Sequence, residues 1–189
     1  MVDIDVCDQA SIDAAASSLK DKGVILDALV NNAGVGLAQE GVKGAEHIID
    51  TNYGGPHRVT MAMAPLINKA TGRIVNVSSG AASAFVKTQS EELKKLFSNP
   101  DLTKDELDAC VKAQVEAGNV GWGNGYGISK AAVSALTLVQ AKAYAPIKVI
   151  ALSPGFIDTA MTKGMGAKLS AEEGCKSLLH CLFSDEVVS

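Results

Sequence analysis

The chain has 189 residues, of which 47% are hydrophobic and 20% are charged, a balance typical of one globular domain with a sizeable core. Its net charge of −4 and aromatic content of 4% do not fit a nucleic-acid-binding or anionic-membrane-binding surface. No apolar run reaches the ~18 residues of a membrane-spanning helix, so we also expect no membrane partner.

Cysteine and histidine patterns bear on metal sites and compartment. The four cysteines are scattered without a CxxC pair, and the three histidines are isolated. This pattern predicts reduced thiols and no metal site, with a disulfide or zinc framework as the alternative. The start MVDIDVCD is acidic and lacks the apolar core of a signal peptide, which leads us to expect a cytoplasmic protein.

Strand-like and helix-like segments alternate along the chain. Continuous apolar or β-branched runs predict strands buried on both faces; they are VDIDV (2–6), LDALVN (26–31), RIVNV (73–77) and IKVIAL (147–152). Helical patterns cover 10–20, roughly 43–68, 126–143 and 170–183, the last with a capping box of Ser170 and Glu173. Strands that alternate with helices predict an α/β fold with a parallel sheet covered on both faces.

Residues 80–125 interrupt this alternation. SEELKKLF and LTKDELDACVKAQVEAG predict two short helices, the second with a capping box of Thr103 and Glu106. The segment ends in the glycine-rich GNVGWGNG, directly before Tyr126. A helical insertion at this point predicts control of access to a neighbouring site, with a structural flap as the alternative.

Turns of small and hydroxyl-bearing residues follow three of the predicted strands. They are NNAG (31–34), NVSSGAAS (76–83) and SPGFIDT (153–159). The carboxyl ends of parallel strands meet at one edge of the sheet, where open α/β folds bind ligands. Each turn alone also fits a role in closing the chain, but together they predict a binding site.

A tyrosine and a lysine stand four residues apart at the start of the helix predicted over 126–143. On a helix, Tyr126 and Lys130 share a face, with their bases roughly 6 Å apart. An ammonium near a phenol stabilises the phenolate and lowers the phenol pKa from about 10, which suits acid–base chemistry. The alternative is a surface tyrosine beside a solvated lysine.

The ordered set of motifs resembles the short-chain dehydrogenase/reductase family, in particular its carbonyl-reductase-like branch. The motifs that carry the resemblance are DIDV, LVNNAG, TNYGG, GRIVNVSS, YGISKAAV, SPGFIDT and SAEEG. The resemblance implies a Rossmann-like, doubly wound parallel sheet. It also implies an oxidoreductase in which NADPH delivers hydride to the carbonyl of a small ketone, aldehyde or quinone.

The resemblance assigns four catalytic residues. Tyr126 would donate the proton, and Lys130 would lower the tyrosine pKa and hold the nicotinamide ribose hydroxyls. Ser79 would bond the substrate oxygen, with Ser78 as the alternative. Asn52 would anchor a water that links Lys130 to solvent, unless it simply faces solvent.

The resemblance also assigns cofactor-binding and substrate positions. Besides Tyr126 and Lys130, the cofactor-binding positions are Asp5, Val6, Asn32, Ala33, Gly34, Pro154, Gly155, Ile157 and Thr159. Phe156 would line the substrate pocket together with Ser79 and Tyr126, or serve as an ordinary packing residue.

The long separation of 47 residues between Ser79 and Tyr126 also matches the carbonyl-reductase branch. In that branch the extra helical segment covers the helix face that other members use to dimerise. We therefore expect a monomer.

Part of the family pattern is missing from the sequence. The phosphate-binding loop TGxxxGxG appears nowhere, and two βα units of about 30 residues each have no counterpart. EVVS at 186–189 resembles the middle of the last strand. We therefore interpret residues 1–189 as a single partial Rossmann-like domain that lacks the first βαβα portion and the end of the last strand.

These gaps affect the cofactor and the sheet edge. The positions that select NADP over NAD are absent, so NAD remains an alternative cofactor. The family's first strand, which pairs with the LDALVN strand, is also absent, so LDALVN would expose an apolar edge. Two other functions therefore stay open: a shortened, non-catalytic interaction module that binds through this edge, and an epimerase or dehydratase of the related extended fold.

Overall fold

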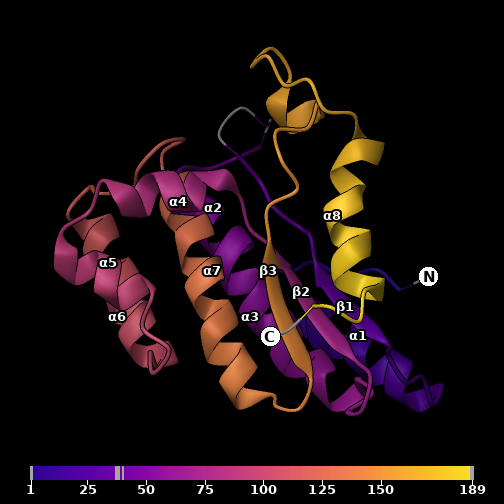
Figure 1. Cartoon of the computed structure of the whole chain (residues 1–189). Helices are drawn as coiled ribbons and strands as arrows, with labels where there is room; N and C mark the ends of the chain where they lie inside the picture. Colours follow the sequence, from indigo (N-terminus) through magenta and orange to yellow (C-terminus); the bar gives the residue numbers. More distant parts are fainter. Residues whose placement is uncertain (1, 37–38, 40, 188–189) are drawn as a thin grey trace.

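The computed structural model describes residues 2–36, 39 and 41–187 (Figure 1). Its strands are β1 (Ala28–Asn31), β2 (Arg73–Val77) and β3 (Lys148–Leu152). Its α-helices are α1 (Gln9–Asp21), α2 (Ala45–Ile49), α3 (Gly55–Met63), α4 (Gly80–Lys87), α5 (Glu91–Phe97), α6 (Lys104–Glu116), α7 (Tyr126–Ala143) and α8 (Ala171–Phe183). A π-helical segment spans Asp50–Gly54, and 3₁₀ turns span Ala64–Leu66 and Ala160–Thr162.

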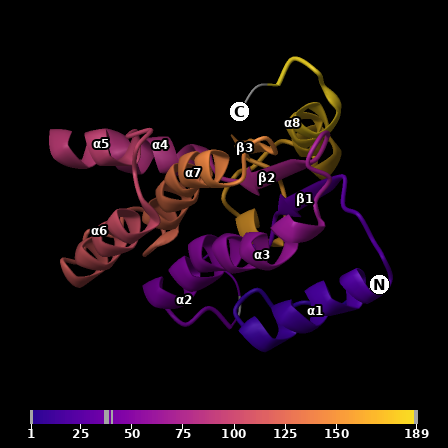
Figure 2. The same ribbon diagram turned by 90° about the horizontal axis from the view of Figure 1, so that it is seen from below.

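The three strands form a parallel sheet in the order β1-β2-β3, with Val30 in register with Val75 and Val75 with Ile150. Helices α3 and α7 lie on one face and α8 on the other (Figure 2). Side chains alternate between the faces, so that Ile74 and Val149 pack in one cluster while Val75 packs with α8 in another. The predicted α/β class with a two-sided parallel sheet is confirmed.

The N-terminal run VDIDV is not a strand, so this prediction was wrong. Val2 and Val6 instead pack against the cluster formed by α1 and α3. Asp5 makes its hydrogen bonds locally: its N–H donates to Ser11, and its carboxylate accepts from the Cys7 N–H. An extended run becomes a strand only beside a partner strand, and the described residues place none next to this segment.

The edge of the sheet beside β1 is open, as the sequence suggested. Among the described strands, β1 pairs only with β2. The strand is shorter than the predicted 26–31, because it begins at Ala28. Leu26 forms only an isolated bridge with Ile67. An apolar groove of about 300 Å³ runs between β1, α1, α3 and the segment 2–6.

The helical region predicted over 43–68 divides into α2, the π segment, α3 and a 3₁₀ turn. Gly55 starts α3 where the chain passes close to Val6: a Cβ at this glycine would lie 2.9 Å from a Val6 methyl carbon. Among the described residues, no helix is both long enough and apolar enough to cross a bilayer.

The insertion contains three helices rather than the two predicted. The additional helix, α4, begins directly after β2, where the Ser79 hydroxyl accepts the Ala81 N–H. The predicted capping boxes of α6 and α8 are both present, and α7 has the predicted bounds. At the other end, Glu186 lies in a turn and Val187 is not in a strand, so this part of the EVVS prediction was wrong; residues 188–189 lie outside the described residues.

Candidate active site

The first turn of α7 presents Tyr126 and Lys130 on one face. A glycine-rich segment leads into this helix. Its last residue, Gly125, has φ +113°, a conformation that residues with a Cβ rarely adopt, and α7 begins directly after it. The Lys130 ammonium lies 5.6 Å from the centre of the Tyr126 ring. It is buried, with 5% of the residue exposed, and donates a 2.8 Å hydrogen bond to the Val77 carbonyl at the end of β2. The solvated-lysine alternative was therefore wrong.

Burial controls the electrostatics of this pair. It lowers the pKa of Lys130 to about 8 and raises the pKa of Tyr126, while a hydrogen bond with the Ser79 hydroxyl partly opposes the rise at the tyrosine. The net pKa of Tyr126 is therefore raised, and the predicted lowering by Lys130 stays a prediction. The ammonium is directed to the Val77 carbonyl, and loss of water around the phenol outweighs the remaining effects.

The adjacent serines after β2 have different partners. Ser78 is buried; its hydroxyl donates to the Lys130 carbonyl at 3.0 Å and bonds the Ser134 hydroxyl at 2.7 Å. Ser79 faces the pocket, where it contacts Tyr126 and caps α4. Of the two serines, the geometry places Ser79 where a substrate oxygen could be bonded.

Asn52 lies in the π segment and is 1% exposed, so the solvent-facing alternative was wrong. Its amide oxygen accepts the Val35 N–H at 2.7 Å, and its amide nitrogen donates to the Val35 carbonyl and the Ser129 hydroxyl at 2.9 and 3.1 Å. The side chain thus joins the turn after β1 to α7. The predicted water relay through Asn52 stays a prediction.

The turn after β1 fits close approach by a ligand. A Cβ at Gly34 would lie 3.2 Å from the Asn52 amide oxygen and 3.6 Å from the Lys130 nitrogen, so the glycine keeps this space open. Among the described residues, Lys130 makes one hydrogen bond, which leaves two of its three N–H donors for ligand hydroxyls. Asn32 and Ala33 line the apolar groove beside β1 together with Val6.

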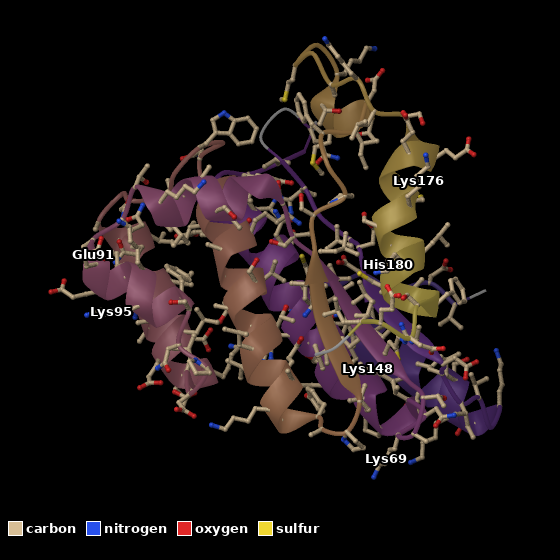
Figure 3. The ribbon with its side chains drawn as sticks, viewed as in Figure 1. Lys69, Glu91, Lys95, Lys148, Lys176 and His180 are labelled. Carbon is tan, nitrogen blue, oxygen red and sulfur yellow. The ribbon has the colours of Figure 1, made fainter. Side chains whose placement is uncertain are left out.

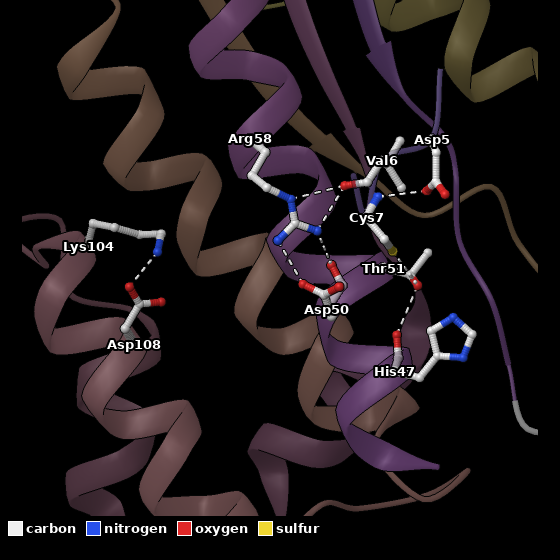
Figure 4. Close-up of polar contacts among 9 residues, drawn as sticks. All are labelled: Asp5, Val6, Cys7, His47, Asp50, Thr51, Arg58, Lys104 and Asp108. Atoms are coloured by element: carbon white, nitrogen blue, oxygen red, sulfur yellow. Dashed lines mark hydrogen bonds and ion pairs between the residues drawn. The ribbon is translucent and has the colours of Figure 1, made fainter. Parts of the chain in front are cut away.

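Asp5 and Val6 lie in the N-terminal segment, close to Arg58 of α3 (Figure 4), and of the two only Val6 lines that groove. The Val6 carbonyl accepts two hydrogen bonds from Arg58, at 3.0 and 2.8 Å, which fix the end of the N-terminal segment on α3. Asp5 is exposed and turns back to the Cys7 N–H at 2.9 Å; it does not line the groove. The structure therefore brings Val6, but not the Asp5 side chain, to the same groove as Asn32 and Ala33, the predicted cofactor-binding residues after β1.

In the loop after β3, too, some of the predicted residues line a pocket and others do not. Gly155, with φ +89°, and Phe156 line the pocket at Tyr126. Ile157 forms a bridge with Leu169 and packs on Gly174 of α8, and Thr159 caps the following 3₁₀ turn. Pro154, Ile157 and Thr159 are not among the described residues that line the pocket.

The pocket at Tyr126 has a volume of about 140 Å³. None of the described residues that line it carries a charge; they are Gly36, Ser79, Trp122, Gly123, Tyr126, Gly155, Phe156, Met161, Thr162 and Met165. Sequence reasoning missed Trp122 and the two methionines. Trp122 had a signal, because it is the only tryptophan of the chain and stands four residues before Tyr126. The methionines had none, since their approach to Tyr126 depends on the path of the loop.

Comparisons with known proteins agree with this architecture. A short chain dehydrogenase family model matches residues 1–91, and an enoyl-(acyl carrier protein) reductase model matches residues 108–182. The chain is 33% identical to (+)-neomenthol dehydrogenase of Arabidopsis thaliana, over 92% of this chain and 69% of that protein. It is 32% identical to carbonyl reductase [NADPH] 1 of Homo sapiens, over 94% of this chain and 69% of that protein.

A solved structure gives the same result. The menthone neomenthol reductase from Mentha piperita superimposes with a TM-score of 0.72 at 27% identity, over 98% of this chain and 76% of that one. Two sequence relatives and one solved structure thus each match more than nine tenths of this chain. The chain belongs to the short-chain dehydrogenase/reductase family, a family of oxidoreductases.

Proposed function

We propose that this protein is an NADP-dependent carbonyl reductase that acts on small ketones, aldehydes or quinones. The observation that carries the proposal is the joint position of Ser79 and Tyr126 at an uncharged pocket, with the buried Lys130 ammonium one helical turn further on. Two hydroxyl groups that converge on one point can bond a single carbonyl oxygen.

The residues around Lys130 fit a nicotinamide dinucleotide. The free N–H donors of Lys130 and the open space at Gly34 suit ribose hydroxyls, and the groove at Asn32 and Ala33 suits the rest of the nucleoside. When bound, this cofactor supplies the hydride. NADP rather than NAD is supported by the carbonyl reductase relatives, which are named for NADPH.

The protein's own part of the reaction is to stabilise charge and move a proton. As negative charge develops on the carbonyl oxygen, the hydroxyls of Ser79 and Tyr126 donate hydrogen bonds to it. The tyrosine proton then passes to that oxygen and leaves an alcohol and a phenolate. The raised pKa of Tyr126 keeps the phenol protonated at neutral pH, and the nearby ammonium of Lys130 favours the phenolate once it forms.

The test is the substitution Tyr126→Phe, which removes the hydroxyl and keeps the ring. We expect the rate of NADPH oxidation with a ketone to fall by roughly 10²- to 10⁴-fold. NADPH affinity should fall by much less than the rate, because Lys130 and the groove beside β1 remain. Tyr144→Phe is the matched control, because this partly buried tyrosine lies at the far end of α7. Equal turnover by wild type and Tyr126→Phe would refute the proposal.

A second candidate function follows from the open edge of β1. A strand of another protein could pair with β1 and bury the apolar groove of about 300 Å³ beside it. Titration with NADPH separates the two functions, because an interaction module need not bind a nucleotide. Saturable micromolar binding supports the reductase, whereas a folded chain that binds neither NADPH nor NADH supports the module.

A further inference from the structure

Trp122 forms the outer wall of the Tyr126 pocket. The two rings lie edge to face, with centroids 5.8 Å apart and planes at 86°. The indole is 64% exposed. A large aromatic side chain held so openly beside a catalytic phenol offers a surface that a ligand can cover.

The backbone holds this tryptophan in place. Gly121 and Gly123, on either side, have φ values of +72° and +70°, and the Trp122 carbonyl accepts the Gly127 N–H of α7 at 3.0 Å. A Cβ at Gly121 would lie 2.5 Å from a Phe85 ring carbon, so the chain passes directly over α4. The backbone on both sides of Trp122 is therefore held in place, and it attaches the indole beside the Tyr126 pocket.

The remaining walls favour a flat ring. Phe156, Met161 and Met165 complete the pocket with another aromatic ring and two thioethers. An apolar cavity of about 150 Å³ holds one benzene ring, so the pocket volume of about 140 Å³ corresponds to one six-membered ring. Aromatic rings and thioether sulfur atoms pack favourably on the faces and edges of a planar π system.

We propose that Trp122 is a specificity-determining residue, whose indole selects a carbonyl conjugated to a flat six-membered ring over the same carbonyl on a saturated ring. The inference rests on the proposed reductase function for its kinetic consequences, but ligand recognition by the indole can be measured without turnover. A saturated ring is thicker and has no π face, so it loses the aromatic contacts while burying the same number of atoms.

Acetophenone and cyclohexyl methyl ketone are suitable probes, because they share one carbon skeleton and do not alkylate the free cysteines. Isothermal titration in the presence of NADP⁺ measures their dissociation constants for wild type, Trp122→Leu and Trp122→Phe. Wild type should bind acetophenone more tightly, on the order of fivefold for one aromatic contact. Trp122→Leu should remove most of this preference, and Trp122→Phe should restore part of it. Phe183→Leu, an exposed aromatic on α8, is the control.

Fluorescence gives a second readout, since Trp122 is the only tryptophan. Acrylamide should quench it readily in the free protein, and saturating ketone should protect it. Loss of ligand preference in Trp122→Leu, with a melting temperature near that of wild type, supports the inference. An unchanged preference in Trp122→Leu, or a wild type that binds neither ketone or both equally, overturns it.

Turnover separates this inference from the proposed function. If wild type and Phe183→Leu show the expected binding preference but oxidise no NADPH with either ketone, recognition by Trp122 stands and the reductase proposal fails. If they reduce both ketones and the ratio of kcat/KM values is the same in Trp122→Leu, the reductase proposal stands and the role of Trp122 fails.

Discussion

Ser78 and Ser79 are neighbours in sequence but have separate tasks in the structure. Ser78 bonds the backbone of α7 through the Lys130 carbonyl and the Ser134 hydroxyl, whereas Ser79 faces the pocket and Tyr126. The two serines therefore form a matched pair of substitutions within one turn.

We predict that Ser79→Ala lowers kcat/KM for a ketone at least tenfold, because the carbonyl oxygen loses one of its two donors. Its stability should fall by only about 1 kcal/mol, from the lost cap of α4. Ser78→Ala should do the opposite, with a larger loss of stability and kcat/KM within a few-fold of wild type. Steady-state kinetics and urea unfolding check both; a larger catalytic defect in Ser78→Ala would contradict the assignment.

Lys130 is a charge held in a site that disfavours charge. Its pKa falls from 10.5 to about 8, which corresponds to about 3 kcal/mol of unfavourable burial at neutral pH. Replacing Lys130 would remove this penalty but would leave the Val77 carbonyl without its donor, at a cost of about 1 kcal/mol. Lys130 therefore lowers the stability of the folded chain at neutral pH.

We predict that Lys130→Met raises the free energy of unfolding at pH 7 by about 2 kcal/mol and abolishes reductase activity. The folded pKa lies below the unfolded one, so the folded wild type binds fewer protons, and its stability rises with pH between about 8 and 10.5. The variant lacks this rise, and its advantage should shrink across that window. Urea unfolding at pH 7 and pH 10 measures the difference; a variant less stable than wild type at pH 7 would contradict it.

At the scale of elements, buried side-chain amides join strands β1 and β2 to helices α3 and α7. Asn76 on β2 accepts from Asn31 on β1 at 2.7 Å and donates to Thr137 and Gln140 on α7 at 2.9 and 2.8 Å. Asn31 also donates to Thr60 on α3 at 2.9 Å. A connected polar network in a buried sheet fixes register and helix placement together.

We predict that Asn76→Ala lowers the free energy of unfolding by about 2–4 kcal/mol, because the Gln140 acceptor and one Asn31 donor lose a partner. Asn99→Ala is the control: its carboxamide only accepts an exposed backbone N–H from Asp101, and its loss should be below about 1 kcal/mol. Equal destabilisation by the two substitutions in urea would show that the network adds nothing.

The same elements show what sequence can and cannot predict. RIVNV became β2 with the predicted bounds. Its apolar residues, among them Ile74 and Val75, are buried on both faces of the central strand. VDIDV has a comparable pattern but became an irregular segment, since a strand also needs a partner that its own residues cannot supply. Glycine and alanine at 80–84 concealed α4, whose start depends on the Ser79 cap.

At the scale of the whole molecule, the insertion lies against α7. Phe85, Phe97 and Leu107, one from each inserted helix, pack in a cluster with Ile128 and Leu136. Figure 3 shows Glu91 and Lys95 on the outer side of the insertion, away from α7. A helix face already buried within the chain is not available to a second copy.

We therefore propose that the protein is a monomer. Sedimentation equilibrium over a range of concentrations should give a mass of 19.5 kDa. A mass near twice this value would contradict the proposal and would direct attention to other apolar surfaces, among them the open edge of β1.

The candidate site was predictable where it depends on order along the chain. Ser79, Tyr126 and Lys130 follow motifs at fixed positions after a strand or at a helix start, and the structure brings all three together. The residues of the pocket walls could not be predicted, because Trp122 and Met161 belong to loops that meet only when the chain is folded. Side-chain pKa directions were equally out of reach, since they depend on burial.

The arrangement of α7 has a consequence for engineering. Its first turn carries the Tyr126 phenol, while most of the rest of its length is buried against the sheet and the insertion. Most of the other pocket walls come from segments 121–123 and 155–165, which are largely exposed. A library that randomises only Trp122, Phe156, Met161 and Met165, and leaves α7 and the positive-φ glycines of these segments untouched, should therefore retain most folded clones, so that changes of substrate range can be selected without first stabilising the scaffold.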